Sequence, residues 1–216
     1  MGERCVDENG IANILVEFYQ NLFASSSPNQ IEEALEATPR VVTEEMNHEL
    51  VAPFGRVEVD IALNQMDPLK SPRPDGMPPF FFQQFWSVIG DEVANAVLTC
   101  LNTGSIPPSI NRTFITLIPK VKSPVRVSEY RPIALCNILY KLISKVLTNR
   151  LKKILPSIIS ESQSAFQSSK VITDNIMVTF KTLHHMKNQK SKKMGFLAMK
   201  LDMSKAYDRV EWSYLR

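Results

Sequence analysis

The segment LDMSKAYDRV, residues 201–210, carries the strongest chemical signal in this sequence. An apolar stretch leads to Asp202, and Asp208 follows in a segment with helical spacing. A carboxylate at the end of a strand is well placed to hold a hard divalent cation such as Mg²⁺, because the sheet fixes it and the tip is wet. Mg²⁺ between a carboxylate and substrate phosphates is typical of phosphoryl transfer. The alternative is an N-cap, which binds the backbone N–H groups of a helix, and spacing alone favours the cap.

A carboxylate at a strand end requires strands, and three short segments have that composition. Residues 195–202 alternate and then stay apolar, which predicts a half-buried or buried strand that delivers Asp202. Residues 113–118 are β-rich and too short for a stable helix, and 131–136 are suited to a partner strand. About a dozen residues separate these two, so we expect an antiparallel pair with a projecting loop.

Long helices are predicted on both sides of this strand pair. The clearest covers 137–155, with an apolar side, a side that carries most of its lysines, and Pro156 as its expected end. A single helix is predicted over 80–101, and Gly104 ends it.

The N-terminal part is predicted to contain helices separated by loops, and SPRPDGMPP over 71–79 is predicted to lack regular structure. A helix over 57–66 is expected to bury Val57, Ile61 and Leu63 or Met66. Further helices are predicted over 11–22, from Thr43, and from Thr173 or Asp174 through Met186. The order is helical at the start and mixed after residue 110, which predicts an α+β fold.

The charge of the chain is divided unevenly. Residues 1–109 contain 5 Lys and Arg against 16 Asp and Glu, a net −11, while residues 110–216 contain 20 against 6, a net +14. A strongly basic half favours a polyanionic partner, most often nucleic acid. Mutual attraction of the two halves is the alternative, and charge counting alone does not separate the two.

Composition and cysteine usage narrow the class of protein. With 44% hydrophobic and 22% charged residues, the chain has globular composition and no segment suited to a bilayer span. The cysteines Cys5, Cys100 and Cys136 lie far apart, which argues against a zinc site or disulfide framework. We therefore expect an intracellular protein, nuclear or cytoplasmic, that does not bind membranes.

Five segments together resemble the reverse transcriptase of LINE-type (non-LTR) retrotransposons, in that family's order and spacing. They are LNQMDPLKSPRPDGMPPFFFQQFW, LIPKVKSP, SEYRPIALCNILYKLISKVLTNRLKKILPSIISESQSAF, ITDNI and KLDMSKAYDRVEW. Upstream, EFYQNLF and TEEMNHELVAPF resemble the connector that leads into the polymerase. The resemblance implies a truncated right-hand polymerase, fingers and first part of the palm, preceded by a helical connector. Its implied domains are a connector over 1–55 and a partial reverse transcriptase domain over 56–216.

The resemblance also implies an activity and its partners. In an intact relative, the 3′-hydroxyl of a DNA primer attacks the α-phosphate of a dNTP on an RNA template, with Mg²⁺ as cofactor. Asp202 matches the first catalytic carboxylate, which binds the metal, and the backbone carbonyl of Met203 is a minor ligand in the same site. Tyr207 matches the aromatic gate that excludes a ribonucleotide 2′-hydroxyl. Asp208 completes the motif, with a structural rather than a metal-binding role.

Two basic residues match the part of the fingers that meets the incoming triphosphate. They are Lys120 and Arg131, which flank the predicted loop between the two strands. Such side chains neutralise phosphate well. Without the resemblance, Lys120 reads as an exposed loop lysine and Arg131 as a partner of Glu129 or of a helix end. Tyr207 likewise reads as a core residue, and the basic side of 137–155 as a solvated face rather than a binder of the primer–template backbone.

The sequence departs from the family pattern in places. Arg73 stands where the family has glycine, and Ser168, Ser169 and Lys170 replace a Pro-Gly-Arg run. The sequence ends at Arg216 before any Tyr-Ala-Asp-Asp-like motif, so we expect no polymerase activity from this chain alone. Two other readings stay open: a non-catalytic nucleic-acid-binding remnant and a non-functional pseudogene product.

Overall fold

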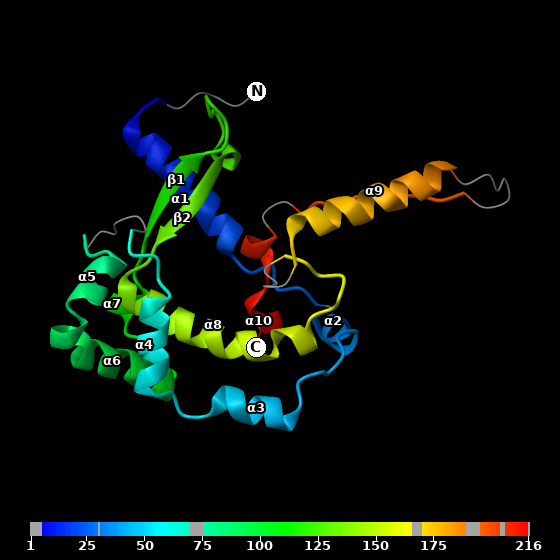
Figure 1. Ribbon diagram of the computed structural model, residues 1–216. Coiled ribbons are helices and arrows are strands. Elements are labelled where there is room, and N and C mark those ends of the chain that lie inside the picture. The colour runs from blue at the N-terminus through cyan, green and yellow to red at the C-terminus, as the bar shows by residue number, and fades with distance from the viewer. Residues whose placement is uncertain are drawn as a thin grey trace. The chain divides into compact units, whose positions relative to one another are not determined.

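The computed structural model describes residues 6–29, 31–69, 76–165, 170–188, 195–203 and 206–215. The chain divides into two compact units, one of Val41–Ile158 and one of Met1–Arg40 with Ile159–Arg216 (Figure 1). The predictions made for Cys5, Arg73, Ser168 and Ser169 lie outside the described residues.

The unit Val41–Ile158 consists of a group of helices and a two-stranded sheet that extends away from them (Figure 1), which confirms the α+β prediction for this part. Its elements are α3 (Glu44–Val51), α4 (Arg56–Asn64), α5 (Pro79–Gln84), α6 (Trp86–Thr103), α7 (Pro108–Asn111), β1 (Phe114–Pro119), the 3-10 turn η1 (Val127–Glu129), β2 (Tyr130–Leu135) and α8 (Ile138–Ile158). Thr43 caps α3 through its hydroxyl, as predicted, and Gly104 ends α6 in the left-handed conformation with φ 68°.

The core of this unit forms where α4, α6 and α8 meet. Its buried side chains on these three helices are Val59, Ala62, Leu63, Ala94, Val97, Cys100, Ile138, Leu142, Ile143 and Val146. Burial of this apolar surface is the main stabilising contribution to the unit.

The predicted buried face of α4 was wrong except for Leu63. Val57 is 68% exposed and Ile61 46% exposed, whereas Val59 and Ala62 are fully buried. The buried residues also keep helical spacing, so the helix is rotated relative to the prediction. The small Ala62 faces the core because it lets neighbouring helices approach closely.

The single helix predicted over 80–101 is two helices. Phe85, with φ −100° and ψ 16°, separates α5 from α6. The break gives α5 a direction different from that of α6, and Phe82 is buried. In α5, Gln83 donates from Nε2 to the carbonyl oxygens of Leu63 and Met66, at 3.0 and 2.9 Å. Gln83 thus adds side-chain hydrogen bonds just after α4, where the carbonyl oxygen of Leu63 also accepts from the backbone N–H of Met66 at 3.0 Å.

Pro156 does not end α8, contrary to the prediction. It lies inside the helix, which continues to Ile158. A proline removes one backbone hydrogen bond, and in the last turn few helical residues remain to be disrupted. Before Pro156, the predicted apolar side of α8 is confirmed for Leu142, Ile143, Val146 and Ile154, which are buried, and was wrong for Leu147 and Leu151, which are 48% and 43% exposed.

The strand pair forms as predicted. β1 and β2 are antiparallel, with Phe114 opposite Leu135 at one end and Pro119 opposite Tyr130 at the other. The loop 120–129 projects beyond the second end and contains η1.

The second unit is largely helical in its described residues. It contains α1 (Glu8–Phe23), α2 (Ile31–Glu36), α9 (Ile172–Asn188), the 3-10 turn η2 (Tyr207–Arg209) and α10 (Trp212–Leu215). The helix predicted over 11–22 is confirmed as α1. The helix α9 begins at Ile172, before the cap that was predicted at Thr173 or Asp174. Asp174 lies in the first turn instead, where its carboxylate accepts from the backbone N–H of Val171 at 3.0 Å.

No strand forms at 195–202, which corrects the prediction. The described residues 195–203 carry no regular structure, and none of the other described segments pairs with them. A strand needs a hydrogen-bonding neighbour, and alternation of side chains alone does not supply one. The segment contacts α9 through Phe196 and His185, whose ring centroids lie 6.5 Å apart.

Candidate functional site

The β1–β2 ribbon positions Lys120 and Arg131 near its projecting end. Arg131 lies opposite Ile118 in the register, and the backbone N–H of Lys120 donates to the carbonyl oxygen of Glu129 at 2.7 Å, which continues the ladder by one step. Side chains two residues apart on a strand share a face. Lys120 and Arg131 therefore lie diagonally across one face, and both are exposed.

The loop beside these two residues is held by its own carboxylate. Glu129 accepts hydrogen bonds from the backbone N–H groups of Val125 at 2.6 Å and of Arg126 at 3.0 Å. These bonds hold the pKa of the Glu129 carboxyl below its ordinary value. The Lys120 ammonium donates to the Ser128 carbonyl oxygen at 2.9 Å, so the lysine is anchored to an ordered loop.

The alternative in which Arg131 pairs with Glu129 does not occur. The Glu129 carboxylate is engaged by backbone N–H groups, and none of the ion pairs between described residues includes Arg131. Arg131 thus keeps its guanidinium donors for another anion.

The predicted palm residues lie in the other unit. Asp202 and Met203 are exposed on the irregular segment 195–203, and Tyr207 begins η2. Tyr207 is 78% exposed, which excludes the reading in which it is a core tyrosine. Asp208 is half-buried, and its charge adds to the effect of burial in raising the pKa of Tyr19 on α1. Asp208 therefore acts within the contact between η2 and α1.

The sequence analysis missed one carboxylate, Glu211, which attaches the end of the motif KLDMSKAYDRVEW to the serines that follow α1. It accepts from the hydroxyl of Ser25 at 2.6 Å and from both the N–H and the hydroxyl of Ser26, at 2.9 and 2.6 Å. These bonds, with the Ser25 hydroxyl first, lower the pKa of the Glu211 carboxyl. No sequence signal connects residues this far apart, because only the fold brings them together.

The described residues do not by themselves form a site for Mg²⁺. That ion takes several oxygen ligands, usually carboxylates, substrate phosphates and water. Among the residues the structure describes, no group of three or more His, Cys, Asp or Glu side chains could hold a metal ion. The donor set around Asp202 therefore does not fit a metal centre on its own.

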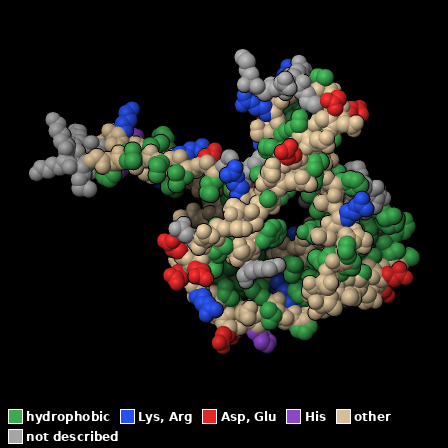
Figure 2. Space-filling model, turned by 180° about the vertical axis from the view of Figure 1, so that it is seen from behind, with side chains coloured by type: hydrophobic (Ala, Val, Ile, Leu, Met, Phe, Trp, Pro, Cys, Tyr) green, Lys and Arg blue, Asp and Glu red, His purple; other side chains and the backbone are tan. Residues whose placement is uncertain are grey.

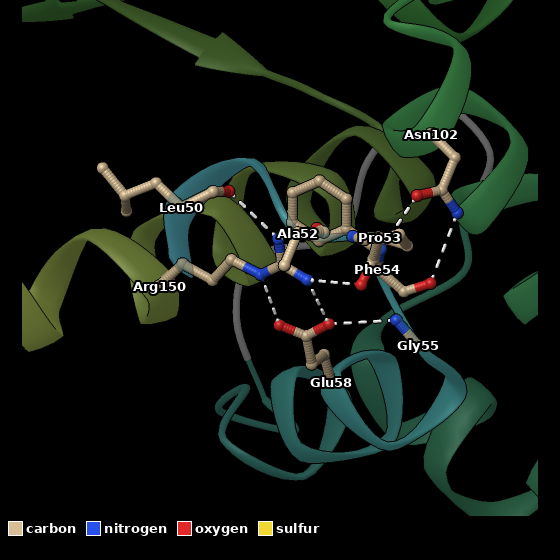
Figure 3. Close-up of polar contacts among 8 residues, drawn as sticks. All are labelled: Leu50, Ala52, Pro53, Phe54, Gly55, Glu58, Asn102 and Arg150. Carbon is tan, nitrogen blue, oxygen red and sulfur yellow. Dashed lines mark hydrogen bonds and ion pairs between the residues drawn. The ribbon is translucent and has the colours of Figure 1, made fainter. Parts of the chain in front are cut away.

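A second residue that the sequence analysis missed, Arg150, organises the unit Val41–Ile158 (Figure 3). Arg150 is only 8% exposed and forms a two-pronged ion pair with Glu58, with Nε–Oε1 at 2.6 Å and Nη2–Oε2 at 2.7 Å. It also donates to the backbone carbonyl oxygens of Leu50, Ala52 and Pro53.

Phe54 completes this cluster. The Arg150 guanidinium carbon lies 3.5 Å from the centroid of the Phe54 ring, a cation–π contact, and Asn102 holds the Phe54 backbone with two hydrogen bonds. The sequence did contain a signal, since Arg150 lies between Val146 and Ile154 at helical spacing on the apolar side of α8. A charged residue at such a position requires a buried partner.

Comparison with known proteins bears on both units. A family model described as reverse transcriptase (RNA-dependent DNA polymerase) matches residues 118–215. That range includes Lys120, Arg131, Asp202, Met203 and Tyr207.

Transposable-element proteins match nearly the whole chain. The 149 kDa protein of transposon TX1 from Xenopus laevis is 33% identical over 97% of this chain, and a Pol polyprotein of the type-2 retrotransposable element R2DM from Drosophila melanogaster is 26% identical over 91%. The chain spans only 16% and 17% of the length of these two relatives. The matched family and the transposable elements agree, and the chain is therefore similar, over nearly its whole length, to part of the reverse transcriptases of LINE-type (non-LTR) retrotransposons.

Proposed function

We propose that this chain supplies the fingers and the first part of the palm of a right-hand RNA-directed DNA polymerase. A connector covers residues 1–55 and the polymerase begins at 56. The contacts of Arg150 attach residues 50–54, at the end of the connector, to α4 and α8 of the polymerase part. This supports a closer connection between connector and polymerase than a boundary at residue 55 implies. The last part of the connector then belongs to the fingers as a folding unit.

In this function, the fingers bind the triphosphate of an incoming dNTP. Lys120 and Arg131 neutralise its phosphates, and the ordered loop 120–129 fixes where they act. Tyr207 contacts the sugar and excludes a 2′-hydroxyl. Asp202 and the carbonyl of Met203 are assigned to Mg²⁺ by the match of their motif alone, and an RNA template and a DNA primer are the partners that the family implies.

The observation that carries this proposal is the pairing of Lys120 and Arg131 on one face of the ribbon. Binding of dATP to the full chain, measured by isothermal titration, tests it. Lys120→Gln and Arg131→Gln are each expected to raise Kd about tenfold, because each loses one charge-assisted hydrogen bond to phosphate. Lys122→Gln, in the same exposed loop, is the matched control and should leave Kd unchanged. An equal loss with Lys122→Gln would contradict the assignment.

A non-catalytic nucleic-acid-binding role is the second candidate. The observation that favours it is the charge of residues 110–216, a net +14, which suits a polyanionic partner. Primer extension on an RNA template with Mg²⁺ separates the two candidates. Template-directed product from this chain would exclude the non-catalytic role, and binding without product would favour it.

A further inference from the structure

The loop 120–129 contains a serine followed by a proline, Ser123 and Pro124, with Arg126 two positions beyond the proline. Proline-directed protein kinases select such a serine, because proline has no backbone N–H to leave unpaired in their substrate groove. The sequence has four Ser or Thr residues that precede a proline: Ser27, Thr38, Ser71 and Ser123. Of these, Ser123 alone has a Lys or Arg three positions later, where these kinases favour a basic residue.

The structure leaves Ser123 accessible to such an enzyme. The loop lies at the end of the β1–β2 ribbon, which extends away from the helices of its unit (Figure 1). Ser123 is exposed and belongs to neither a helix nor a strand, so a kinase can bind it without opening a regular element. The hydrogen bonds that Val125 and Arg126 donate to Glu129 are exposed to water, and such bonds open locally at little cost.

Two of the other Ser/Thr–Pro pairs lie in described segments, and both are less suited. The Thr38 hydroxyl is engaged, because it donates to the carbonyl oxygen of Ala34 at 2.9 Å. Ser27 has a left-handed backbone, with φ 48°, whereas the residue before a proline favours the extended backbone in which kinases bind peptides. Among the three pairs that the structure describes, Ser123 is therefore the best substrate.

A phosphate on Ser123 would enter positive surroundings. Residues 120–131 contain four Lys or Arg and one Glu, a net +3, and the carboxylate of Glu129 is already engaged by backbone N–H groups. Lys120 uses one of its three ammonium donors on the Ser128 carbonyl oxygen, which leaves two for an anion. Three residues of chain span at most about 10 Å, a distance that a lysine and a phosphoserine side chain together can bridge.

We propose that Ser123 is a phosphorylation site of a proline-directed protein kinase, and that its phosphate binds Lys120 in place of the triphosphate of a dNTP. In this reaction a bond forms between Ser123 Oγ and the γ-phosphorus of ATP, and the bond from that phosphorus to the β–γ bridging oxygen breaks. ADP leaves, and the hydroxyl proton passes to a carboxylate of the kinase. The phosphoserine carries about −2 charge and three acceptor oxygens. Its contact with Lys120 stands by itself, whereas the block of dNTP binding rests on the proposed function.

The first experiment incubates the full chain with a recombinant proline-directed kinase, ATP and Mg²⁺, and maps phosphopeptides by mass spectrometry over time. Ser123 is expected to be modified about tenfold faster than Thr38 and Ser27, which serve as controls within the same chain. Ser123→Ala should remove its phosphopeptide and leave the others. Modification of Thr38 or Ser27 as fast as that of Ser123 would overturn the assignment.

The second experiment uses phosphorus NMR to show whether the phosphate contacts Lys120. An exposed phosphoserine has a second pKa of about 6, and a neighbouring cation lowers this pKa. We expect a decrease of about 0.5 in the phosphorylated chain, lost in Lys120→Gln and kept in Lys152→Gln, which removes a charge from an exposed position of α8. A phosphate pKa that is the same in Lys120→Gln and in the unsubstituted chain would overturn the contact.

Binding of dATP by the phosphorylated chain separates this inference from the proposed function. Phosphorylation is expected to raise Kd about tenfold relative to the same chain without phosphate, and kinase-treated Ser123→Ala should keep its Kd. A lowered phosphate pKa with an unchanged Kd would retain the phosphate contact and overturn the block. If Lys120→Gln also binds dATP normally, the triphosphate assignment fails, while the phosphorylation site and its contact with Lys120 stand.

Discussion

The two units of the chain differ in how much of their apolar surface finds a partner. In Val41–Ile158, three helices bury a continuous stripe of side chains, and the charged residue within that stripe is fully paired. In the other unit, Tyr19 alone among the described hydrophobic residues is buried, and α9 carries exposed apolar side chains along its length (Figure 2). Stability and order are therefore expected to differ between units of one chain.

Two carboxylates, Glu58 in the first unit and Glu211 in the second, are held in unlike ways. Glu58 pairs with a buried guanidinium in the first, and Glu211 accepts from exposed serine groups in the second. The chain has two tryptophans, Trp86 in α6 and Trp212 in α10, so single-tryptophan variants report on each unit separately.

Arg150→Met is expected to have the largest effect. It leaves Glu58 without its cation and removes the donors to three backbone carbonyl groups, which should lower the free energy of unfolding by about 4 kcal/mol. Urea unfolding followed by Trp86 fluorescence, in a Trp212→Phe background, measures this. A loss below 1 kcal/mol would show that the cluster is not what holds residues 50–54 to α8.

Leu142→Ala should cost about 3 kcal/mol, because it opens a cavity at the centre of the core. Leu147→Ala on the same helix is the control, since Leu147 is 48% exposed and should change stability little. Similar losses for both would mean that the core of this unit is not centred where the buried stripe lies.

Gly90→Ala tests the fit between α6 and its own Trp86 ring. A Cβ at Gly90 would lie 2.9 Å from Cδ2 of Trp86, which is too close without movement of the ring. We expect a loss of about 2 kcal/mol from this overpacking, although alanine favours helices over glycine. Thermal unfolding monitored by circular dichroism shows whether the variant is less or more stable. A more stable variant would contradict the close packing of Gly90 against Trp86.

Acid is expected to destabilise both units, and this is the smallest of the predicted changes in stability. Hydrogen bonds from Arg150 to Glu58 and from Ser25 to Glu211 are the main causes that lower these two pKa values from 4.5. A depressed folded pKa gives stability that is present above the unfolded pKa and is lost as pH falls through the folded value. Unfolding should therefore become easier below about pH 4.5 in both single-tryptophan variants.

Two substitutions assign this acid response. Glu58→Gln should flatten the response of the Trp86 transition, and Glu211→Gln that of the Trp212 transition. A Glu58→Gln variant whose Trp86 transition keeps its full pH dependence would show that another carboxyl is responsible.

The sequence predicted those elements whose signals are local. Gly104 and Thr43 mark helix ends through their own backbone and side-chain chemistry, and the β-rich segment 113–118 has its partner within a short loop. Features that depend on packing were not predicted, such as the rotation of α4 around Ala62 and the break at Phe85.

The candidate site also contains parts that depend on local interactions and parts that depend on distant segments. The loop that anchors Lys120 follows from local hydrogen bonds of Glu129. The strand expected to carry Asp202 depended on neighbouring strands, which alternation of side chains cannot supply, and the described residues contain none for it.

Hydrogen exchange of the full chain, followed by mass spectrometry, tests most directly the claim that one unit is a packed fold while the segment with Asp202 is open. The account predicts slow exchange across α4, α6 and α8, and exchange at 195–203 close to that of an unfolded peptide. Protection at 195–203 equal to that of α8 would contradict it, and would mean that this segment is a paired strand after all.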